Sequence, residues 1–142
     1  MKILVMGLPG SGKTTFARKL VETLAQHREV IWFNADEIRE QLNDWDFSDQ
    51  GRRRQAERMR DMSDQAVSQG KIAVCDFVCP TLELRNIFAA DKVIWLDTIQ
   101  ISRYEDTNKI FEEPTHYDHK INELDSFPWA AIIADGILDL HV

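Results

Sequence analysis

Residues 7–14 have the sequence Gly-Leu-Pro-Gly-Ser-Gly-Lys-Thr, which fits the phosphate-loop pattern G-x-x-x-x-G-K-[ST]. The glycines let the backbone wrap closely around phosphate oxygens, so that successive N–H groups form an anion-binding nest. In this pattern Lys13 reaches the β- and γ-phosphates and assists catalysis, and the hydroxyl of Thr14 is a ligand for Mg²⁺. The motif predicts a site for ATP and Mg²⁺. Its expected residues are Gly7, Leu8, Pro9, Gly10, Ser11, Gly12, Lys13, Thr14 and Thr15.

The residues on either side of the loop support this interpretation. Residues 3–6 form a short apolar run that is typical of a buried strand, and apolar residues recur at helical spacing from Thr14 to Gln26. The loop therefore joins a strand to the N-terminus of a helix, whose dipole also favours a bound anion.

Strands and helices are predicted to alternate along the rest of the chain. Strands are expected at Lys2–Met6, Val30–Asn34, Ile72–Phe77 and Lys92–Leu96. Helices are expected at Thr14–Gln26, Ala35–Leu42, Asp49–Gln69 and Thr81–Ala89, and from a cap at Ser126 to about Leu140. Residues 98–125 are polar and weakly periodic. The alternation indicates an α/β fold of the P-loop NTPase type, a three-layer sandwich with a parallel sheet covered on both faces. We expect one domain over residues 1–142.

Composition narrows the functional class. No apolar run approaches the length of a membrane span, and the N-terminus lacks the apolar stretch of a signal peptide. The two cysteines, Cys75 and Cys79, do not have the spacing of a zinc site or of a disulfide framework. These features favour a cytoplasmic protein with reduced thiols and no membrane partner.

The negative charge is concentrated in the last third of the chain. Residues 1–92 carry 14 acidic and 14 basic side chains, whereas residues 93–142 carry 10 acidic and three basic ones. Extended nucleic-acid binding needs a basic track, so a nucleic-acid partner is not expected. A small anionic ligand remains compatible with a local arginine cluster. Its members are Arg39, Arg52, Arg53, Arg54, Arg58 and Arg60.

Acidic residues follow the predicted strands at the edge where ligands bind in such sheets. Asp36 follows the second strand, where its carboxylate would contact Mg²⁺ or accept a proton from an acceptor hydroxyl; the alternative is that it caps the helix it precedes. Arg39 is one helical turn later and would hold an anionic group of the acceptor. Asp76 and Asp97 end the third and fourth strands. The pattern does not choose among the three aspartates for the metal.

Four stretches resemble motifs of one known family: GLPGSGKTT at 7–15, NADEIREQLN at 34–43, DFSDQGRRRQAERMR at 46–60 and DFVCPTLELR at 76–85. The last three are similar to DGDNIRxGLN, GFSxxDRxENIRR and SFISPxxxxR of the adenylylsulfate kinases, which phosphorylate the 3′-hydroxyl of adenosine 5′-phosphosulfate with ATP. A weaker similarity follows at 96–114. The resemblance touches most of residues 3–121 and implies an ATP-dependent kinase of sulfate assimilation.

The resemblance also implies a pocket for the acceptor nucleotide. Phe47 would stack on its adenine, and Arg39 and Arg52 would bind its phosphosulfate. Gln55 takes the place of an asparagine that contacts the nucleotide, and the backbone at Val78 would line the same pocket. The expected partner is thus a small anionic nucleotide, and a homodimer is left open.

The chain departs from the family pattern at several positions. Asn34 replaces the first aspartate of DGDNIR, Glu37 replaces its asparagine, and Cys79 replaces the serine before the proline. The basic lid of the family is absent between residues 109–111 and 112–114. Lid closure excludes water and completes such sites, so its absence points to a different acceptor, to hydrolysis or to a compact variant.

Two other functions therefore stay open beside the kinase of the adenylylsulfate type. A 5′-hydroxyl polynucleotide kinase also carries a motif of the form NxDxxR after its second strand, and residues 34–39 suit it. A nucleotide-binding protein without turnover would account for the missing lid. The intact loop, with Lys13 and Thr14, favours turnover.

Overall fold

A five-stranded sheet forms the centre of the molecule, which we describe for residues 1–140 from a computed structural model. The strand order is β2-β3-β1-β4-β5, and each pair of neighbouring strands is parallel. The predicted α/β fold with a parallel sheet is confirmed. The strands are β1 (Lys2–Met6), β2 (Val30–Asn34), β3 (Ile72–Asp76), β4 (Lys92–Leu96) and β5 (His119–Ile121).

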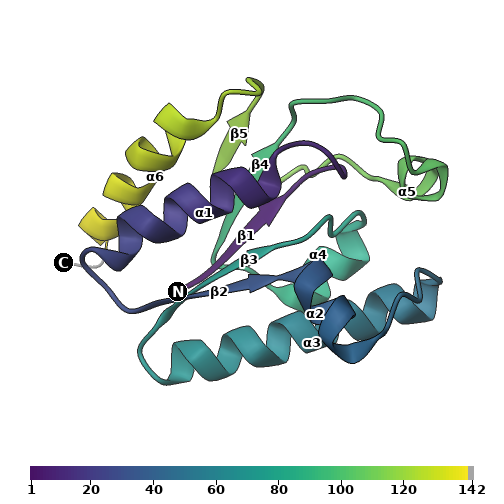
Figure 1. Ribbon diagram of the computed structural model, residues 1–142, viewed down its shortest axis with the longest axis horizontal. Helices are drawn as coiled ribbons and strands as arrows, with labels where there is room; N and C mark the ends of the chain where they lie inside the picture. The colour runs from purple at the N-terminus through teal and green to yellow at the C-terminus, as the bar shows by residue number, and fades with distance from the viewer. Residues whose placement is uncertain (141–142) are drawn as a thin grey trace.

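Helices cover both faces of the sheet and make the predicted three-layer sandwich (Figure 1). Helices α1 and α6 lie on one face, and α2, α3 and α4 lie on the other. Helix α5 lies beyond the carboxyl ends of the strands. Within residues 1–140, no helix combines the length and the apolarity needed to cross a bilayer. The helices are α1 (Lys13–Ala25), α2 (Ala35–Leu42), α3 (Asp49–Ser68), α4 (Leu82–Phe88), α5 (Glu105–Ile110) and α6 (Phe127–Leu140).

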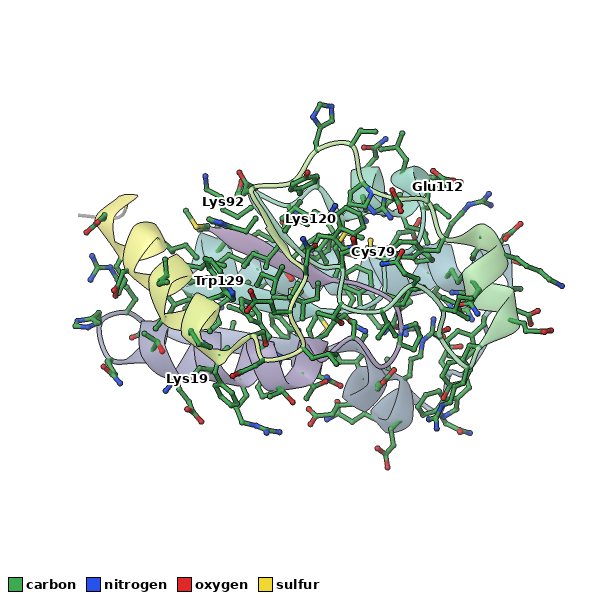
Figure 2. All side chains as sticks on the ribbon, turned by 90° about the horizontal axis from the view of Figure 1, so that it is seen from above. Lys19, Cys79, Lys92, Glu112, Lys120 and Trp129 are labelled. Atoms are coloured by element: carbon green, nitrogen blue, oxygen red, sulfur yellow. The ribbon has the colours of Figure 1, made fainter. Side chains whose placement is uncertain are left out.

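Two of these elements lie in segment 98–125, for which the sequence predicts no structure. β5 has three residues and α5 has six, so neither is long enough to produce a readable periodicity. β5 pairs with β4. Lys120 of β5, labelled in Figure 2, places its Nζ atom 3.5 Å from a carboxylate oxygen of Asp97, just past β4. The short strand thus extends the sheet beyond β4 and forms one of its two edges.

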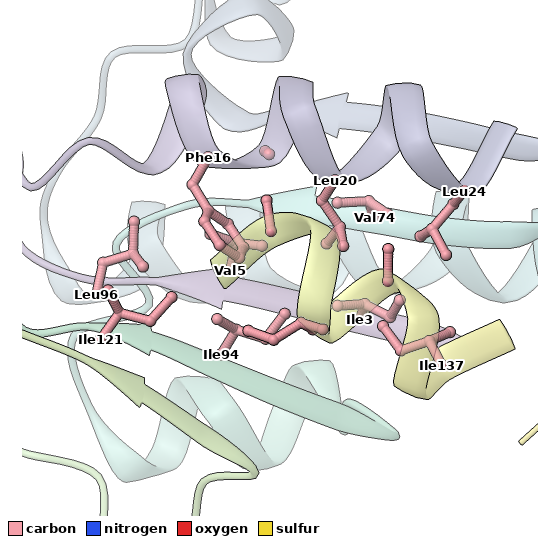
Figure 3. Close-up of a cluster of buried hydrophobic side chains, with 14 of the residues drawn as sticks. Ile3, Val5, Phe16, Leu20, Leu24, Val74, Ile94, Leu96, Ile121 and Ile137 are labelled. Atoms are coloured by element: carbon pink, nitrogen blue, oxygen red, sulfur yellow. The ribbon is translucent and has the colours of Figure 1, made fainter. Parts of the chain in front are cut away.

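A buried apolar cluster fills the space between the sheet and helices α1 and α6 (Figure 3). Phe16, Leu20 and Leu24 of α1 are fully buried, and their spacing places them on one face of the helix. The opposite face of the sheet has its own cluster, which includes Leu4 and Met6 of β1. Successive side chains of β1 therefore enter different cores, which is why this strand is apolar throughout.

The three helices on the second face each begin with a side-chain cap. The side chains of Asn34, Ser48 and Thr81 accept a hydrogen bond from the backbone N–H three residues later, which begins α2, α3 and α4. The predicted cap at Ser48 is confirmed. Helix α3 ends before Gly70, whose φ of 82° suits a glycine at a helix end.

Helix α6 supplies a matched test of this packing. Ile137 is 3% exposed and Ile132 is 59% exposed on the same helix. We expect Ile137→Ala to lower the free energy of unfolding by about 2–4 kcal/mol, because it leaves a cavity in the core. Ile132→Ala should change it by less than about 0.5 kcal/mol. Urea unfolding of both variants makes the comparison, and equal losses would contradict the packing of α6.

Candidate active site

The phosphate loop joins the end of β1 to the N-terminus of α1, as predicted. Gly12 precedes α1 with a φ of 93°, a left-handed conformation that glycine adopts without steric cost. The N–H of Ser11 donates to the carbonyl of Leu8 at 3.1 Å. The hydroxyl of Thr98, just past β4, donates to the carbonyl of Ser11 at 2.8 Å. The loop is thus closed on itself and attached to the end of a neighbouring strand.

The atoms of the loop fit a phosphate group. A Cβ atom added to Gly12 would find nothing within 4 Å, so the loop surface is open at that point. The hydroxyl of Ser11 is the side-chain polar atom that, among residues 1–140, is buried without a hydrogen-bond partner. Burial lowers the pKa of Lys13, and the carboxylates of Asp76 and Asp36 oppose that shift. A phosphate would also favour its charged form.

The side chains around the loop suit a metal ion that is shared with a nucleotide. Within residues 1–140, no three His, Cys, Asp or Glu side chains converge as a metal site. Mg²⁺ in nucleotide sites usually takes one or two protein groups and completes its shell with phosphate oxygens and water. The exposed hydroxyl of Thr14, with Asp36 and Asp76 close enough to act on the adjacent Lys13, fits that description.

Asp76 is a buried carboxylate at the end of β3. Its side chain accepts a hydrogen bond from the indole Nε1 of Trp32 at 2.6 Å and from the amide of Asn34 at 3.1 Å. The same amide nitrogen lies 3.3 Å from the hydroxyl of Thr14. Burial raises the pKa of Asp76, and the bonds from Trp32 and Asn34 and the charge of Lys13 oppose the rise.

The two other strand-end aspartates are more exposed. Asp97 forms the ion pair with Lys120. Asp36 is exposed in the first turn of α2, and the residue that caps this helix is Asn34, so the alternative that Asp36 is the helix cap is wrong. Burial is the main influence on the pKa values of both Lys13 and Arg39, and Asp36 raises both. Asp36 is therefore close enough to act on both the phosphate loop and Arg39.

Phe47 is close to two arginines on the predicted acceptor side. The residue is 49% exposed, and the guanidinium carbons of Arg39 and Arg52 are 4.4 and 5.3 Å from the ring centre. Arg39 is buried and donates from Nη1 to the carbonyl of Asp44 at 2.8 Å. Arg52 donates from Nε to the carbonyl of Phe47 at 2.9 Å. These bonds fix both guanidinium groups beside an aromatic surface, as recognition of an anionic aromatic ligand requires.

Two residues hold this part of the chain against α3. A Cβ atom on Gly51 would collide with the backbone of Asp46, so only glycine allows the segment before Phe47 to pass so close to the helix. Gln55, which the resemblance assigns to the acceptor, is 3% exposed. Its Nε2 donates to the carbonyl of Ala35 at 3.1 Å and its Oε1 accepts from Arg58. These contacts join α3 to the start of α2.

Two adjoining cavities of about 250 and 390 Å³ open beside Arg52, and Phe47 lines the smaller one. Helix α5 forms one wall and Arg52 donates from Nη2 to Thr107 of that helix at 3.3 Å. Burial lowers the pKa of Arg52, and the carboxylates of Asp106 and Asp49 raise it. Sequence reasoning missed this wall because α5 has no periodic pattern. The residues shared by both cavities are Asp49, Arg52, Lys109 and Ile110.

The segment after β3 completes the acceptor side. Val78 is half-buried, and its place in an acceptor pocket stays a prediction. Arg85 donates from Nε to the carbonyl of Cys79 at 3.0 Å and from Nη2 to the carbonyl of Glu112, which Figure 2 labels near α5. The arginine thus joins this segment to the end of α5. Both cysteines are free and buried.

Comparison with known proteins agrees with this geometry. The sequence model of one family, described as adenylylsulphate kinase, matches residues 1–111. The adenylyl-sulfate kinase of Bacillus licheniformis is 36% identical over 87 residues, which are 60% of this chain and 44% of that protein. A probable adenylyl-sulfate kinase of Bacillus subtilis is 38% identical over 82 residues, 56% of this chain and 42% of that protein. The match thus spans less than half the length of these curated relatives.

Solved structures share the fold along nearly the whole chain. The APS kinase of Mycobacterium tuberculosis in complex with AMPPNP and APS has a TM-score of 0.78 at 18% identity, with 98% of this chain and 95% of that one covered. A sugar kinase from Janibacter sp. has a TM-score of 0.72 at 16% identity, with 97% and 94% covered. Because kinases with different substrates share this fold, the structural likeness establishes the fold and the sequence match establishes the family. The chain belongs to the adenylylsulphate kinase family.

Proposed function

We propose that this chain is an ATP-dependent phosphotransferase that moves the γ-phosphoryl group of ATP to a hydroxyl of a small anionic nucleotide. Adenosine 5′-phosphosulfate is the first candidate acceptor, because the family is that of the adenylylsulphate kinases. The observation that carries the proposal is the position of Asp36. Its charge acts on Lys13 of the phosphate loop and on Arg39 beside Phe47, so the nucleotide and acceptor sides meet at this carboxylate.

The residues around Asp36 support a division of tasks. Phosphoryl transfer depends mainly on positioning and on neutralising the charge of the transferred group. Lys13 and the N–H groups of the loop would neutralise that charge, and Thr14 and Asp36 would contact a nucleotide-bound Mg²⁺ and its water shell. Asp36 would also orient the acceptor hydroxyl for in-line attack and accept its proton.

The acceptor side would hold its ligand by stacking and by charge. Phe47 offers half of its surface, and Arg39 and Arg52 supply the positive charge. The shortened lid leaves α5 as the wall of the cavities, and Asp49 and Asp106 reduce the net positive charge beside Arg52. The acceptor that fits has one localised anionic group beside an aromatic ring system. A homodimer and a cytoplasmic location remain predictions.

The function is tested with a panel of acceptors. Purified protein with Mg-ATP should form ADP fastest with adenosine 5′-phosphosulfate, and more slowly with a 5′-hydroxyl oligonucleotide or with water alone. Lys13→Ala should remove the activity, and Lys19→Ala, the same change further along α1, should keep it. Faster ADP formation with the oligonucleotide would show that the acceptor is a polynucleotide. If ATP binds but no acceptor in the panel increases ADP formation, a nucleotide-binding protein without turnover is favoured.

Arg52 tests the acceptor pocket. Replacement by alanine should weaken the acceptor by about 2–4 kcal/mol, because a charge-assisted bond to an anion is lost; ATP affinity should hardly change. Arg60 is on the same helix and pairs with Asp61, so Arg60→Ala is the matched control. Isothermal titration with adenosine 5′-phosphosulfate measures both variants. Wild-type acceptor affinity in Arg52→Ala would place the pocket elsewhere.

Asp36→Asn tests the role of the carboxylate in turnover. The change keeps the size of the side chain and removes its charge, so we expect kcat to fall on the order of 10²- to 10⁴-fold while ATP affinity changes little. Glu40→Gln, an equivalent loss of charge on the exposed part of α2, is the control. Steady-state kinetics and ATP titration separate the two quantities. Near-normal kcat in Asp36→Asn would exclude the catalytic role.

A further inference from the structure

The buried carboxylate of Asp76 is not explained by the tasks assigned above. Its residue is 3% exposed, and among residues 1–140 it belongs to none of the ion pairs. Burying an ionised carboxylate is costly unless a cation balances it. Two hydrogen bonds from neutral groups, Trp32 and Asn34, orient this carboxylate. The charge of Lys13 acts on it without forming an ion pair with it.

The side chain of Asn34 links the carboxylate of Asp76 to Thr14, the predicted metal ligand. The amide nitrogen of Asn34 contacts both carboxylate oxygens of Asp76 at 3.1 Å and the hydroxyl of Thr14 at 3.3 Å. Two groups that contact one nitrogen atom must lie close together. A cation held by Thr14 and the phosphates would therefore be within reach of Asp76, either directly or through one water molecule.

The sequence shows where this carboxylate stands relative to the family pattern. Asn34 stands where DGDNIR has its first aspartate, and Asp76 stands where SFISP has its serine. In the sheet these two positions are cross-strand partners on β2 and β3. In the family pattern the carboxylate is on the second strand and the neutral polar group is on the third. In this chain the neutral Asn34 is on β2 and the carboxylate of Asp76 is on β3.

We propose that Asp76 is the carboxylate that holds the water shell of the nucleotide-bound Mg²⁺ in this protein, and that Asn34 positions it. The inference rests on the proposed function in that it requires a Mg-nucleotide at the phosphate loop. The amide of Asn34 and the indole of Trp32 fix the plane of the carboxylate. Its remaining lone pairs accept hydrogen bonds from metal-bound water, and its charge balances the metal. Asp36, exposed on α2, then acts on the acceptor hydroxyl, and the contact with the metal's water shell that the proposed function gave to Asp36 passes to Asp76.

Nucleotide binding with and without metal tests this assignment independently of turnover. Isothermal titration with AMPPNP is done in Mg²⁺ and in EDTA, and the ratio of the two affinities is the metal enhancement. Asp76→Asn should lose about 10- to 100-fold of this enhancement, as for other groups that orient a metal's ligands, and should keep its affinity in EDTA. Asp97→Asn, which removes the strand-end carboxylate paired with Lys120, should keep the wild-type ratio.

The exchange variant gives the second readout. Asn34→Asp combined with Asp76→Asn returns the carboxylate to β2, and its metal enhancement should recover to near the wild-type ratio. This variant contains the Asp76→Asn change, so recovery excludes general damage to the fold. Thermal unfolding without ligand checks each variant; if Asp76→Asn alone does not fold, the exchange variant decides, and an absent enhancement in it overturns the proposal.

The remaining outcomes distinguish the two proposals. A wild-type protein that binds no AMPPNP under either condition contradicts the proposed function. A wild-type enhancement that persists in Asp76→Asn, or that is lost in Asp36→Asn instead, leaves the function standing and overturns the role of Asp76. A wild-type protein that binds AMPPNP equally in Mg²⁺ and EDTA also overturns it.

Discussion

The parallel pairing of β1 with β3 and β4 is the constraint on which the site depends. It brings the carboxyl ends of these strands to one edge of the sheet, where the phosphate loop leaves β1. Because β1 is buried on both faces, a slip of its register by one residue would move each of its side chains into the opposite core, whose packing it does not match. The loop, Asp76 and Thr98 are therefore held in fixed relation by the two cores and not by bonds among themselves alone.

Charge at this edge is arranged around burial. Lys13 and Asp76 are each shifted towards their neutral forms by burial and towards their charged forms by the other's charge. The opposite charges of the two residues offset part of the cost of burying them, and a bound phosphate would stabilise the charged lysine further, as a divalent cation would the carboxylate. Burial and charge at this edge thus suit a metal-bound nucleotide, and they would supply the preorganisation that the proposed phosphoryl transfer requires.

The residues of the proposed acceptor side are held in place mainly by contacts with the backbone. Arg39, Arg52 and Phe47 are held by backbone carbonyls, by Gly51 and by the short helix α5, and the surface they form is mixed in charge. With a shortened lid, the proposed reaction would need the bound acceptor itself and α5 to exclude water. Binding by stacking needs little closure, because an aromatic ring covers its partner directly.

Local patterns in the sequence determined the phosphate loop, its flanking strand and helix, and most other elements, because loop chemistry, apolar periodicity and caps such as Ser48 act over a few residues. The family resemblance added Phe47 and Arg52, which the fold brings together. Three features needed the tertiary structure. Gln55 is a contact within the core, α5 forms a cavity wall, and Asn34 and Asp76, 42 positions apart, touch each other and approach Thr14. The physical reason is that strand order decides which strand ends become neighbours, and this order results from packing two helical layers on one sheet, which no local pattern encodes.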